Sequence, residues 1–504
     1  MAPEASIVHW TTTLRIGIQV SLVQAAIAVN RFGLGARNHD LKAVAGDPRG
    51  WLKAQLRPET SMPAPLAALP STEDATTAFA KWLSSIGVGP SGEGTPRINS
   101  LAPAAAMGGT GGGNKQGIEQ SYVKTFGPGY ATAVSARIGV GETSERPFFE
   151  RLVRFWGNHF TVSAAKASAI VLAPVFERDA IRAHVCGKFA DMLLASCRHP
   201  AMLLYLDNYI SIGPNSYLAK NPGVLPEYLR SLLKGLNENL AREVLELHTM
   251  GVRGGYTQAD VTSLAKIITG WGYLGPNNQA NDTPGKFRFL GAAHEPGTHT
   301  LLGKAYEQQG EAQGEAALRD LAAHPATAEH LATKLARHFI ADNPPPGAVA
   351  AIARAYRASE GDLAATAAAI VDAPEAWAPQ PRKFKAPEEL LISTIRALGA
   401  PKLDGQKLVA LLDRMGQRPY WAPAPDGWPD AEDHWISADA IWKRLEWADA
   451  LSKGLAAANL DPMEIAARVL GPQLSANTQA AIAGAESPAQ GLAIFLASPE
   501  FQRR

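Results

Sequence analysis

The chain contains very little cysteine. Cys186 and Cys197 are the only two among its 504 residues. If both lie on one helix, as we expect, rigid helix geometry separates them by about 16 Å, too far for a disulfide. The sequence also has no CxxC pair and no Cys/His cluster, which excludes a structural zinc site of the finger type. Both thiols are therefore expected to be small, buried packing residues.

Long apolar runs and an excess of one charge are missing as well. No stretch of eighteen apolar residues occurs, so no transmembrane helix is predicted. Lys and Arg total 48 and Asp and Glu total 47, which gives a formal net charge of +1 and no electrostatic reason to expect a nucleic-acid partner.

Alternating β-branched residues are rare, whereas alanine and leucine are abundant. This pattern predicts a mainly α fold: a large multi-helix domain with one short β-hairpin and long irregular loops. Residues 285–290 and 299–302 are the two expected strands.

Composition divides the chain into four expected segments. They are an N-terminal helical arm (1–88), a Gly/Ala/Pro-rich linker (89–121), a central helical domain with the putative site (122–380) and a C-terminal helical region packed on the central domain (381–504). The GGTGGG run at 108–113 has no Lys-Ser/Thr sequel, so it is interpreted as linker and not as a phosphate-binding loop.

The beginning of the chain is ambiguous as a targeting signal. Residues 16–29 are fairly apolar and end in Ala26-Ile27-Ala28, which resembles a signal-peptidase site. Glu4 and the single Arg15 make a poor basic region before it. An uncleaved first helix over 14–30 is favoured, and without a convincing signal the expected location is cytoplasmic.

The stretch around which the rest seems arranged is a helical hairpin over 236–273. A glycine turn at 251–255 joins its two helices, and Thr257 with Asp260 forms a capping box for the second. Asn239, Arg242, Glu243 and Glu246 form a polar stripe on the first helix beside an apolar one. The stripe is either a functional surface or an ordinary solvated face in which Arg242 and Glu246 form an i,i+4 pair.

Several other segments combine bulky and polar residues. Asn158 and His159 lie within FWGNHF, where a core histidine bonded to a backbone carbonyl is the alternative to a functional one. A loop at 291–297 carries His294 and Glu295.

Two further segments have alternative interpretations. On a helix over 324–340, His330, Lys334 and His338 recur at i, i+4, i+8; this is compatible with a metal face, but a solvated stripe is favoured. The proline-rich aromatic loop at 418–429 is either a stacking platform for a sugar or a lid on the core.

As an enzyme, the chain would gather these groups into one cleft. The predicted catalytic residues are His159, Glu243, Asp260 and His294. The predicted substrate-binding residues are Asn158, Asp207, Asn208, Asn237, Asn239, Arg242, Tyr256 and Trp271. Glu243 and Glu246, at i,i+3, could share a divalent metal ion, so the cofactor is unknown with a divalent metal possible.

The order of the motifs resembles a known family. It includes AIAVNRFGLGAR, FWGNHF, PAMLLYLDN, NENLAREVLELHTMGVRGGYTQADV, FRFLGAAHEPGTHTLLG, HPATAEHLATKLARHF and GQRPYWAPAPDGWP. Over residues 24–455 the chain resembles the bacterial domain-of-unknown-function family numbered eighteen hundred. The resemblance implies frequent export through twin-arginine signals, and genes that often neighbour those of a sulfatase-like protein of the alkaline-phosphatase type. It implies no reaction, cofactor or catalytic residue.

The resemblance adds alternatives for location and function. No Arg-Arg pair lies near Met1, so a periplasmic location stays the alternative. We expect hydrolysis or elimination, possibly metal-dependent, on a glycan or another sulfated or oxygen-rich small-molecule substrate, partly because of the gene neighbourhood. The alternatives are a helical scaffold or partner of the sulfatase-like protein, and a haem or redox protein. Side chains of His159, Glu243 and His294 within about 10 Å of one another would favour a site.

Overall fold

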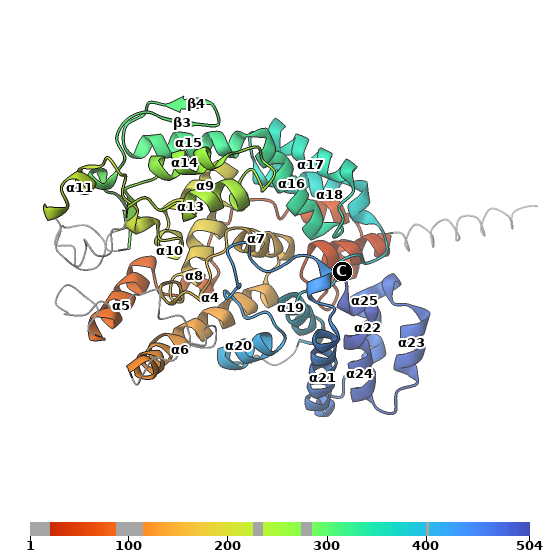
Figure 1. The fold of residues 1–504 in the computed structure, drawn as a ribbon. Coiled ribbons are helices and arrows are strands. Elements are labelled where there is room, and N and C mark those ends of the chain that lie inside the picture. The colour runs from red at the N-terminus through yellow and green to blue at the C-terminus, as the bar shows by residue number, and fades with distance from the viewer. Residues whose placement is uncertain (1–20, 87–113, 225–234, 274–284, 400–402) are drawn as a thin grey trace, which may run out of the picture.

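The computed structural model describes residues 21–86, 114–224, 235–273, 285–399 and 403–504. In this part of the chain helices dominate, which confirms the predicted mainly α class (Figure 1). The N-terminal helices are η1 (Ala28–Phe32), α2 (Asp40–Val44), α3 (Pro48–Lys53), α4 (Ala64–Ala67), α5 (Thr72–Ser85) and α6 (Asn114–Thr143). Helix α6 takes up the end of the predicted linker, so residues 114–121 are helical; residues 89–113 lie outside the described residues.

The middle of the chain consists of short helices around one long amphipathic one, α7. In order they are α7 (Pro147–His159), η4 (Ala167–Ala169), α8 (Ala173–Phe176), η5 (Glu177–Ile181), η6 (Arg182–His184), α9 (Phe189–Arg198), α10 (Pro200–Tyr205), η7 (Asn208–Ile210), α11 (Tyr217–Lys220), η8 (Pro222–Val224), α13 (Asn239–Glu243), η9 (Val244–His248) and α14 (Gln258–Ile267).

Four short strands follow, in two antiparallel pairs. The strands are β1 (Trp271–Tyr273), β2 (Phe287–Phe289), β3 (His299–Leu301) and β4 (Lys304–Tyr306), with η10 (Gly291–Ala293) between β2 and β3. The two predicted strands exist, but they do not pair with each other. Trp271 pairs with Phe289 across β1 and β2, and His299 pairs with Tyr306 across β3 and β4. The second helix of the hairpin therefore ends before Trp271, which begins a strand.

The C-terminal half is again helical. Its elements are α15 (Glu311–Ala323), α16 (Pro325–Phe339), α17 (Pro346–Ala358), α18 (Leu363–Asp372), η11 (Pro374–Trp377), α19 (Pro387–Leu398), α20 (Gly405–Arg414), η12 (Glu432–His434), α21 (Ala438–Gly454), η13 (Ala456–Ala458), α22 (Pro462–Leu470), η14 (Gly471–Gln473), α23 (Ala476–Ala483), α24 (Pro488–Ala497) and α25 (Pro499–Gln502).

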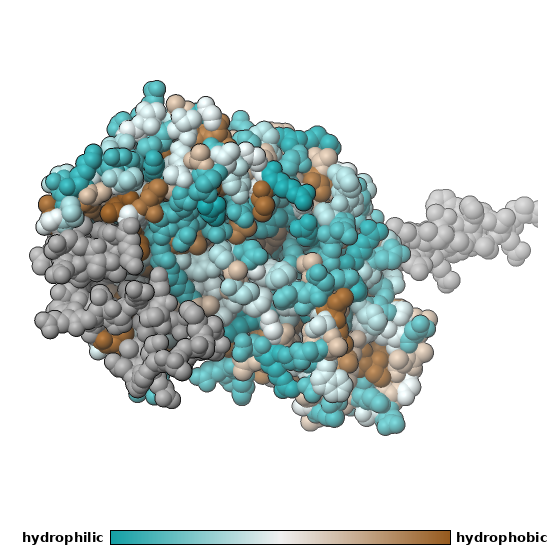
Figure 2. Space-filling view, viewed as in Figure 1, coloured by the Kyte–Doolittle hydropathy of each residue, from teal (hydrophilic) through white to brown (hydrophobic). Residues whose placement is uncertain are grey.

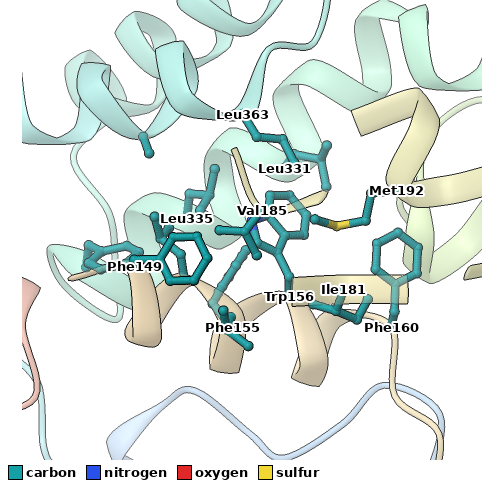
Figure 3. Packing of buried hydrophobic residues seen from close by; sticks show 14 of the residues in the cluster. Phe149, Phe155, Trp156, Phe160, Ile181, Val185, Met192, Leu331, Leu335 and Leu363 are labelled. Atoms are coloured by element: carbon teal, nitrogen blue, oxygen red, sulfur yellow. The ribbon is translucent and has the colours of Figure 1, made fainter. Parts of the chain in front are cut away.

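Segments far apart in the sequence share one hydrophobic core. Phe32 of η1 is fully buried, and its ring contacts Phe148 of α7, Phe339 of α16 and Trp377 of η11 at centroid distances of 5.4 to 6.0 Å. Figure 3 shows Trp156 of α7 surrounded by apolar side chains from other helices. The described part of the N-terminal arm is thus built into the main core.

In the described part of the chain, three helical segments contain a wide π-type turn. They are η1, η5 and η9, and each falls within or next to a stretch of polar residues. Such turns are rare and occur often at functional sites. The turn η5, followed by η6 and a break, divides the single helix expected over 175–197. Cys186 therefore lies between helices, half-buried, while Cys197 is buried in α9 as expected.

No helix among the described residues is long and apolar enough to cross a membrane. Residues 16–20 of the expected targeting segment lie outside the described residues, and residues 21–32 are helical. The visible face of the molecule is mainly hydrophilic, with apolar residues in separate small patches (Figure 2).

Candidate functional site

A polar cavity of about 430 Å³ lies between helices α7 and α16, the aromatic loop 418–429 and the residues 430–435 that follow this loop. A volume of this size is in the range of small-molecule sites. Its ionisable lining residues are Arg137, Arg151, Arg154, His159, Glu177, His330, Lys334, Arg337, His338, Glu388, Glu389, Asp426, Asp430 and Arg504, and Asn158, Tyr420, Trp428 and Trp435 also contribute.

Helix α7 positions one wall by its amphipathic periodicity. Its apolar side chains are buried in the core, while Arg151, Arg154 and Asn158, at i, i+3 and i+7, face the cavity. The Asn158 amide donates to the carbonyl of Trp428 at 2.8 Å and accepts from the amide of Trp428 at 2.7 Å. This predicted substrate-binding residue therefore clamps the aromatic loop to α7.

The aromatic loop needs two unusual backbone conformations to lie against the cavity. Gly427 has a φ of +85°, and a Cβ there would lie 2.5 Å from the Asn158 carbonyl oxygen, so only glycine fits. Tyr420 has a φ of +55°, and its hydroxyl donates to Glu177 at 3.2 Å. The sequence left two alternatives for this loop, a stacking platform for a sugar or a lid on the core. In the structure the loop forms one wall of the cavity.

Four of the lining arginines are paired with glutamates. Glu388 of α19 accepts from Nε of Arg137 at 2.8 Å and from Nε of Arg154 at 3.1 Å. Burial alone would favour the neutral acid, but the two guanidinium groups outweigh it and hold the pKa of Glu388 below its ordinary value. Glu389 likewise binds Arg151 and Arg504.

Helix α16 supplies the opposite wall. His330, Lys334 and His338 line the cavity, so the favoured expectation of a solvated stripe was wrong. Burial lowers the pKa of Lys334 to about 8, against the opposing effects of Asp430 and Asp426. The Nζ atom makes no hydrogen bond or ion pair with any residue in the described ranges, which distinguishes it from the paired arginines.

His338 and Asp430 form a hydrogen-bonded pair. Nδ1 of His338 lies 2.8 Å from Oδ1 of Asp430, so Nδ1 carries the proton and Nε2 keeps its lone pair. Nε2 is buried and has no hydrogen-bond partner among the described residues. Burial lowers the pKa of His338 in spite of Asp430. The imidazole is therefore neutral near pH 7 and can accept a proton.

His159, like His338, uses one ring nitrogen for a hydrogen bond and leaves the other without a partner among the described residues. Its Nε2 lies 3.1 Å from the backbone carbonyl of His248 and must donate to it, so Nδ1 is an unprotonated acceptor. Nδ1 has no donor among the described residues. Burial holds the pKa of His159 well below its ordinary value. The expected backbone bond exists, but it uses only one of the two ring nitrogens.

Of the other predicted catalytic residues, Glu243 is linked to the cavity by charge. Burial raises the pKa of Glu243 to about 6, with Glu246 and Asp426 adding to the effect. Asp426 lines the cavity, whereas Glu243 and Glu246 do not. The carboxyl of Glu246 accepts from the hydroxyl of Tyr256 at 3.4 Å.

Arg242 and Asp260 are engaged in contacts within the hairpin. Arg242 binds Glu238 at 3.2 Å and Gln258 at 2.8 Å, so the expected pair with Glu246 is replaced by one with the preceding turn. Asp260 forms the predicted capping box with Thr257 and also accepts from the amide of Leu302 at 2.7 Å. Neither residue lines the cavity.

The remaining predicted residues hold loops and strands. Nδ1 of His294 donates to the carbonyl of Thr269, in the segment before β1, at 3.0 Å, and His294 does not line the cavity. Asn208 donates to the carbonyls of Ile268 and Trp271, and Trp271 is fully buried. Asn237 donates to the carbonyl of Asp207 and accepts from the backbone amide of Asn239. Asp207 forms an ion pair with Lys166.

The predicted metal site consists of the carboxylates of Glu243 and Glu246. Among the residues that the structure describes, no group of three or more His, Cys, Asp or Glu side chains is suited to hold a metal ion. A divalent ion on Glu243 and Glu246 stays a prediction.

Sequence reasoning overlooked the main functional candidates. Lys334 and His338 were noticed by their spacing, but Asp430 and Arg337 were not singled out. Asp430 directly follows the aromatic loop, and this adjacency to a predicted site element is the one signal that could have pointed to it.

Fold and cavity together define a helical protein with a polar cavity that contains acid, base and unpaired cationic groups. The model of the family described as "Protein of unknown function (DUF1800)" matches residues 27–503. The chain belongs to this family, as the motifs indicated. No curated protein and no solved structure matches the chain.

Two lysines near the cavity should respond in opposite ways to replacement by methionine. Lys334 is half-buried and has no ion pair among the described residues, and its pKa of about 8 lies below its unfolded value. Its charge therefore destabilises the fold fully below pH 8, and the effect fades as pH rises toward the unfolded pKa. Lys383 binds Asp342 and the carbonyl of Asp430.

At pH 7 we expect Lys334→Met to stabilise the protein by about 1–3 kcal/mol and Lys383→Met to destabilise it by about 2–3 kcal/mol. Thermal denaturation midpoints at pH 7, repeated near pH 10, measure both effects. A lower midpoint for Lys334→Met at pH 7 would show that Lys334 has a stabilising partner.

Proposed function

We propose that the chain is an enzyme that performs acid–base chemistry on an oxygen-rich small molecule or glycan in this cavity. The observation that carries the proposal is the His338–Asp430 pair. Asp430 orients the ring and fixes its tautomer, and Nε2 of His338 is left as a base without a partner.

Two reaction types use such a base. In hydrolysis, Nε2 of His338 would take a proton from a water molecule whose oxygen bonds to the substrate, while the bond to the leaving oxygen breaks and that oxygen takes a proton from solvent. In elimination, Nε2 would take a proton from a carbon of the substrate, the C–H electrons would form a double bond, and the C–O bond would break as the leaving oxygen takes a proton from solvent. Lys334 would stabilise the negative charge that develops in either case, because its ammonium group is not neutralised by a direct ion pair.

Replacement of His338 by glutamine tests whether its imidazole is the catalytic base. Wild type would be screened on uronate polymers, sulfated glycans and neutral glycans, with new reducing ends reporting hydrolysis and ultraviolet absorbance of an unsaturated product reporting elimination. On the substrate that is turned over, we expect His338→Gln to lower kcat by about 10²–10⁴-fold, because the base is lost. Asp430→Asn should have a smaller effect, since the base is kept and only its orientation changes.

His184→Gln is the matched control. His184 lies outside the cavity and bonds the carbonyl of Ala180 in its own segment, so its loss should leave the rate unchanged. An unchanged rate for His338→Gln would contradict the proposed base. No turnover of any substrate by wild type would favour a non-catalytic role.

A divalent ion at Glu243 and Glu246 is a separate proposal. It is supported by the raised pKa of Glu243, to which burial, Glu246 and Asp426 contribute, because a cation would relieve the repulsion between these carboxylates. Elemental analysis of the purified protein should then find a stoichiometric divalent metal that the double variant Glu243→Gln, Glu246→Gln lacks. An absorption spectrum of the same sample tests the haem alternative.

Partnership with a sulfatase-like protein is a second candidate function. It is supported by the exposed apolar side chains of Ile436, Trp442 and Leu445 on and beside α21. Size-exclusion chromatography of the two purified proteins should show co-elution, which Trp442→Glu would abolish. Val252→Glu, at an exposed position in the hairpin turn, is the control and should still co-elute. Separate elution of the wild-type pair would argue against the partnership.

A further inference from the structure

The cavity contains two kinds of cation. Four arginines of the first kind each bind a glutamate, and these ion pairs hold the walls of the cavity together. They are Arg137, Arg151, Arg154 and Arg504. Lys334 and Arg337 have no such carboxylate. Nε of Arg337 donates to the backbone carbonyl of Asp342 at 3.2 Å, and neither of its Nη atoms bonds any residue in the described part of the chain.

These two unpaired cations lie three residues apart on α16, and both line the cavity. At this spacing side chains are neighbours on one face of a helix. Both residues are half-buried, and a bound anion would form charge-assisted hydrogen bonds with both groups.

We propose that the cavity binds an acidic sugar, with its oxyanion held by Lys334 and Arg337 and one of its hydroxyl groups donating to Nδ1 of His159. The proposal rests on the proposed function and names the substrate class of that same site. The shared chemistry is an oxyanion on a hydroxylated ring, and the oxyanion is either a carboxylate or a sulfate ester.

The tautomer of His159 is the reason for the hydroxyl contact. Because Nε2 must donate to the carbonyl of His248, Nδ1 is an acceptor that only a donor can satisfy. The hydroxyl groups of a sugar are such donors. His159 is 1% exposed, and its ring is packed against Phe155, Trp156 and Phe160, so the acceptor is fixed in place.

Other parts of the cavity suit the same class of ligand. Trp428 and Trp435 both line the cavity, with ring centroids 6.1 Å apart, so part of its wall is aromatic, as is common in sugar sites. Asp426 and Asp430 lie on the loop side.

Ligand-detected NMR by saturation transfer tests this on the full-length protein. The probes are D-glucuronate, glucose 6-sulfate, D-glucose and acetate. We expect transfer to D-glucuronate or glucose 6-sulfate, and whichever is stronger identifies the oxyanion. D-Glucose, which lacks the anion, and acetate, which lacks the hydroxyl groups, should each bind at least about tenfold more weakly.

Variants assign the contacts. Lys334→Met and Arg337→Met should each weaken binding of the acidic sugar by about tenfold or more, whereas Lys304→Met, at an exposed lysine outside the cavity, should leave it unchanged. Replacement of His159 by phenylalanine would change the packing of the core, so its contact with the sugar is tested in the wild type. The readout is the ¹⁵N signal of the His159 imidazole. Its Nδ1 shift should move when the acidic sugar is added.

The dependence on pH gives an independent signature. Above pH 8 wild type should lose affinity by up to tenfold per pH unit as Lys334 is deprotonated, and Lys334→Arg should not. The charged and titratable groups around Lys334 are Arg337, Asp426, Asp430, His159, His248 and His330. Burial lowers the pKa of all three histidines, so their charge does not change in this range.

Equal binding of D-glucose and D-glucuronate, or of acetate and D-glucuronate, would overturn the proposal, and so would a complete lack of binding by both acidic sugars. The test is separate from catalysis because His338→Gln should still bind the acidic sugar. Binding by that variant without turnover in wild type would sink the enzyme proposal and leave the ligand class intact.

Discussion

Two glutamates of α19 hold the walls of the cavity together. Glu388 joins α6 to α7 through Arg137 and Arg154, and Glu389 joins α7 to the end of the chain through Arg151 and Arg504. A buried carboxylate needs a partner, and a buried guanidinium needs one as well, so removal of any member would leave an uncompensated charge. The relative positions of these helices depend on this network.

The same ion-pair network determines which charged groups of the cavity are available to bind a ligand. Once Glu388 and Glu389 are saturated by four arginines, the two cations of α16 that remain in the cavity have no carboxylate to bind. The lowered pKa of Lys334 indicates that its charge is kept at some cost in stability, as is common where a site must be ready for a ligand. His338 and His159 follow the same logic, because each uses one nitrogen for structure and leaves the other unpaired.

Local motifs predicted part of this site. FWGNHF and the proline-rich aromatic loop were both singled out, and the structure joins them through the two hydrogen bonds between Asn158 and Trp428. The predicted centre was nevertheless the polar stripe of the hairpin, whose Arg242 and Asp260 bind within the hairpin itself. A surplus of polar residues on a helix does not say whether a neighbour will satisfy them.

By itself, the sequence determined the features that depend on near neighbours. The helical class, the capping box of Thr257 and Asp260 and the positions of β2 and β3 follow from periodicity and local hydrogen bonding. Only the tertiary structure decided which strands pair, where a helix widens into a π-turn, and that the α16 stripe faces a cavity. The cavity in particular depends on contacts between residues more than a hundred positions apart, such as Arg154 with Glu388, and no local periodicity encodes such contacts.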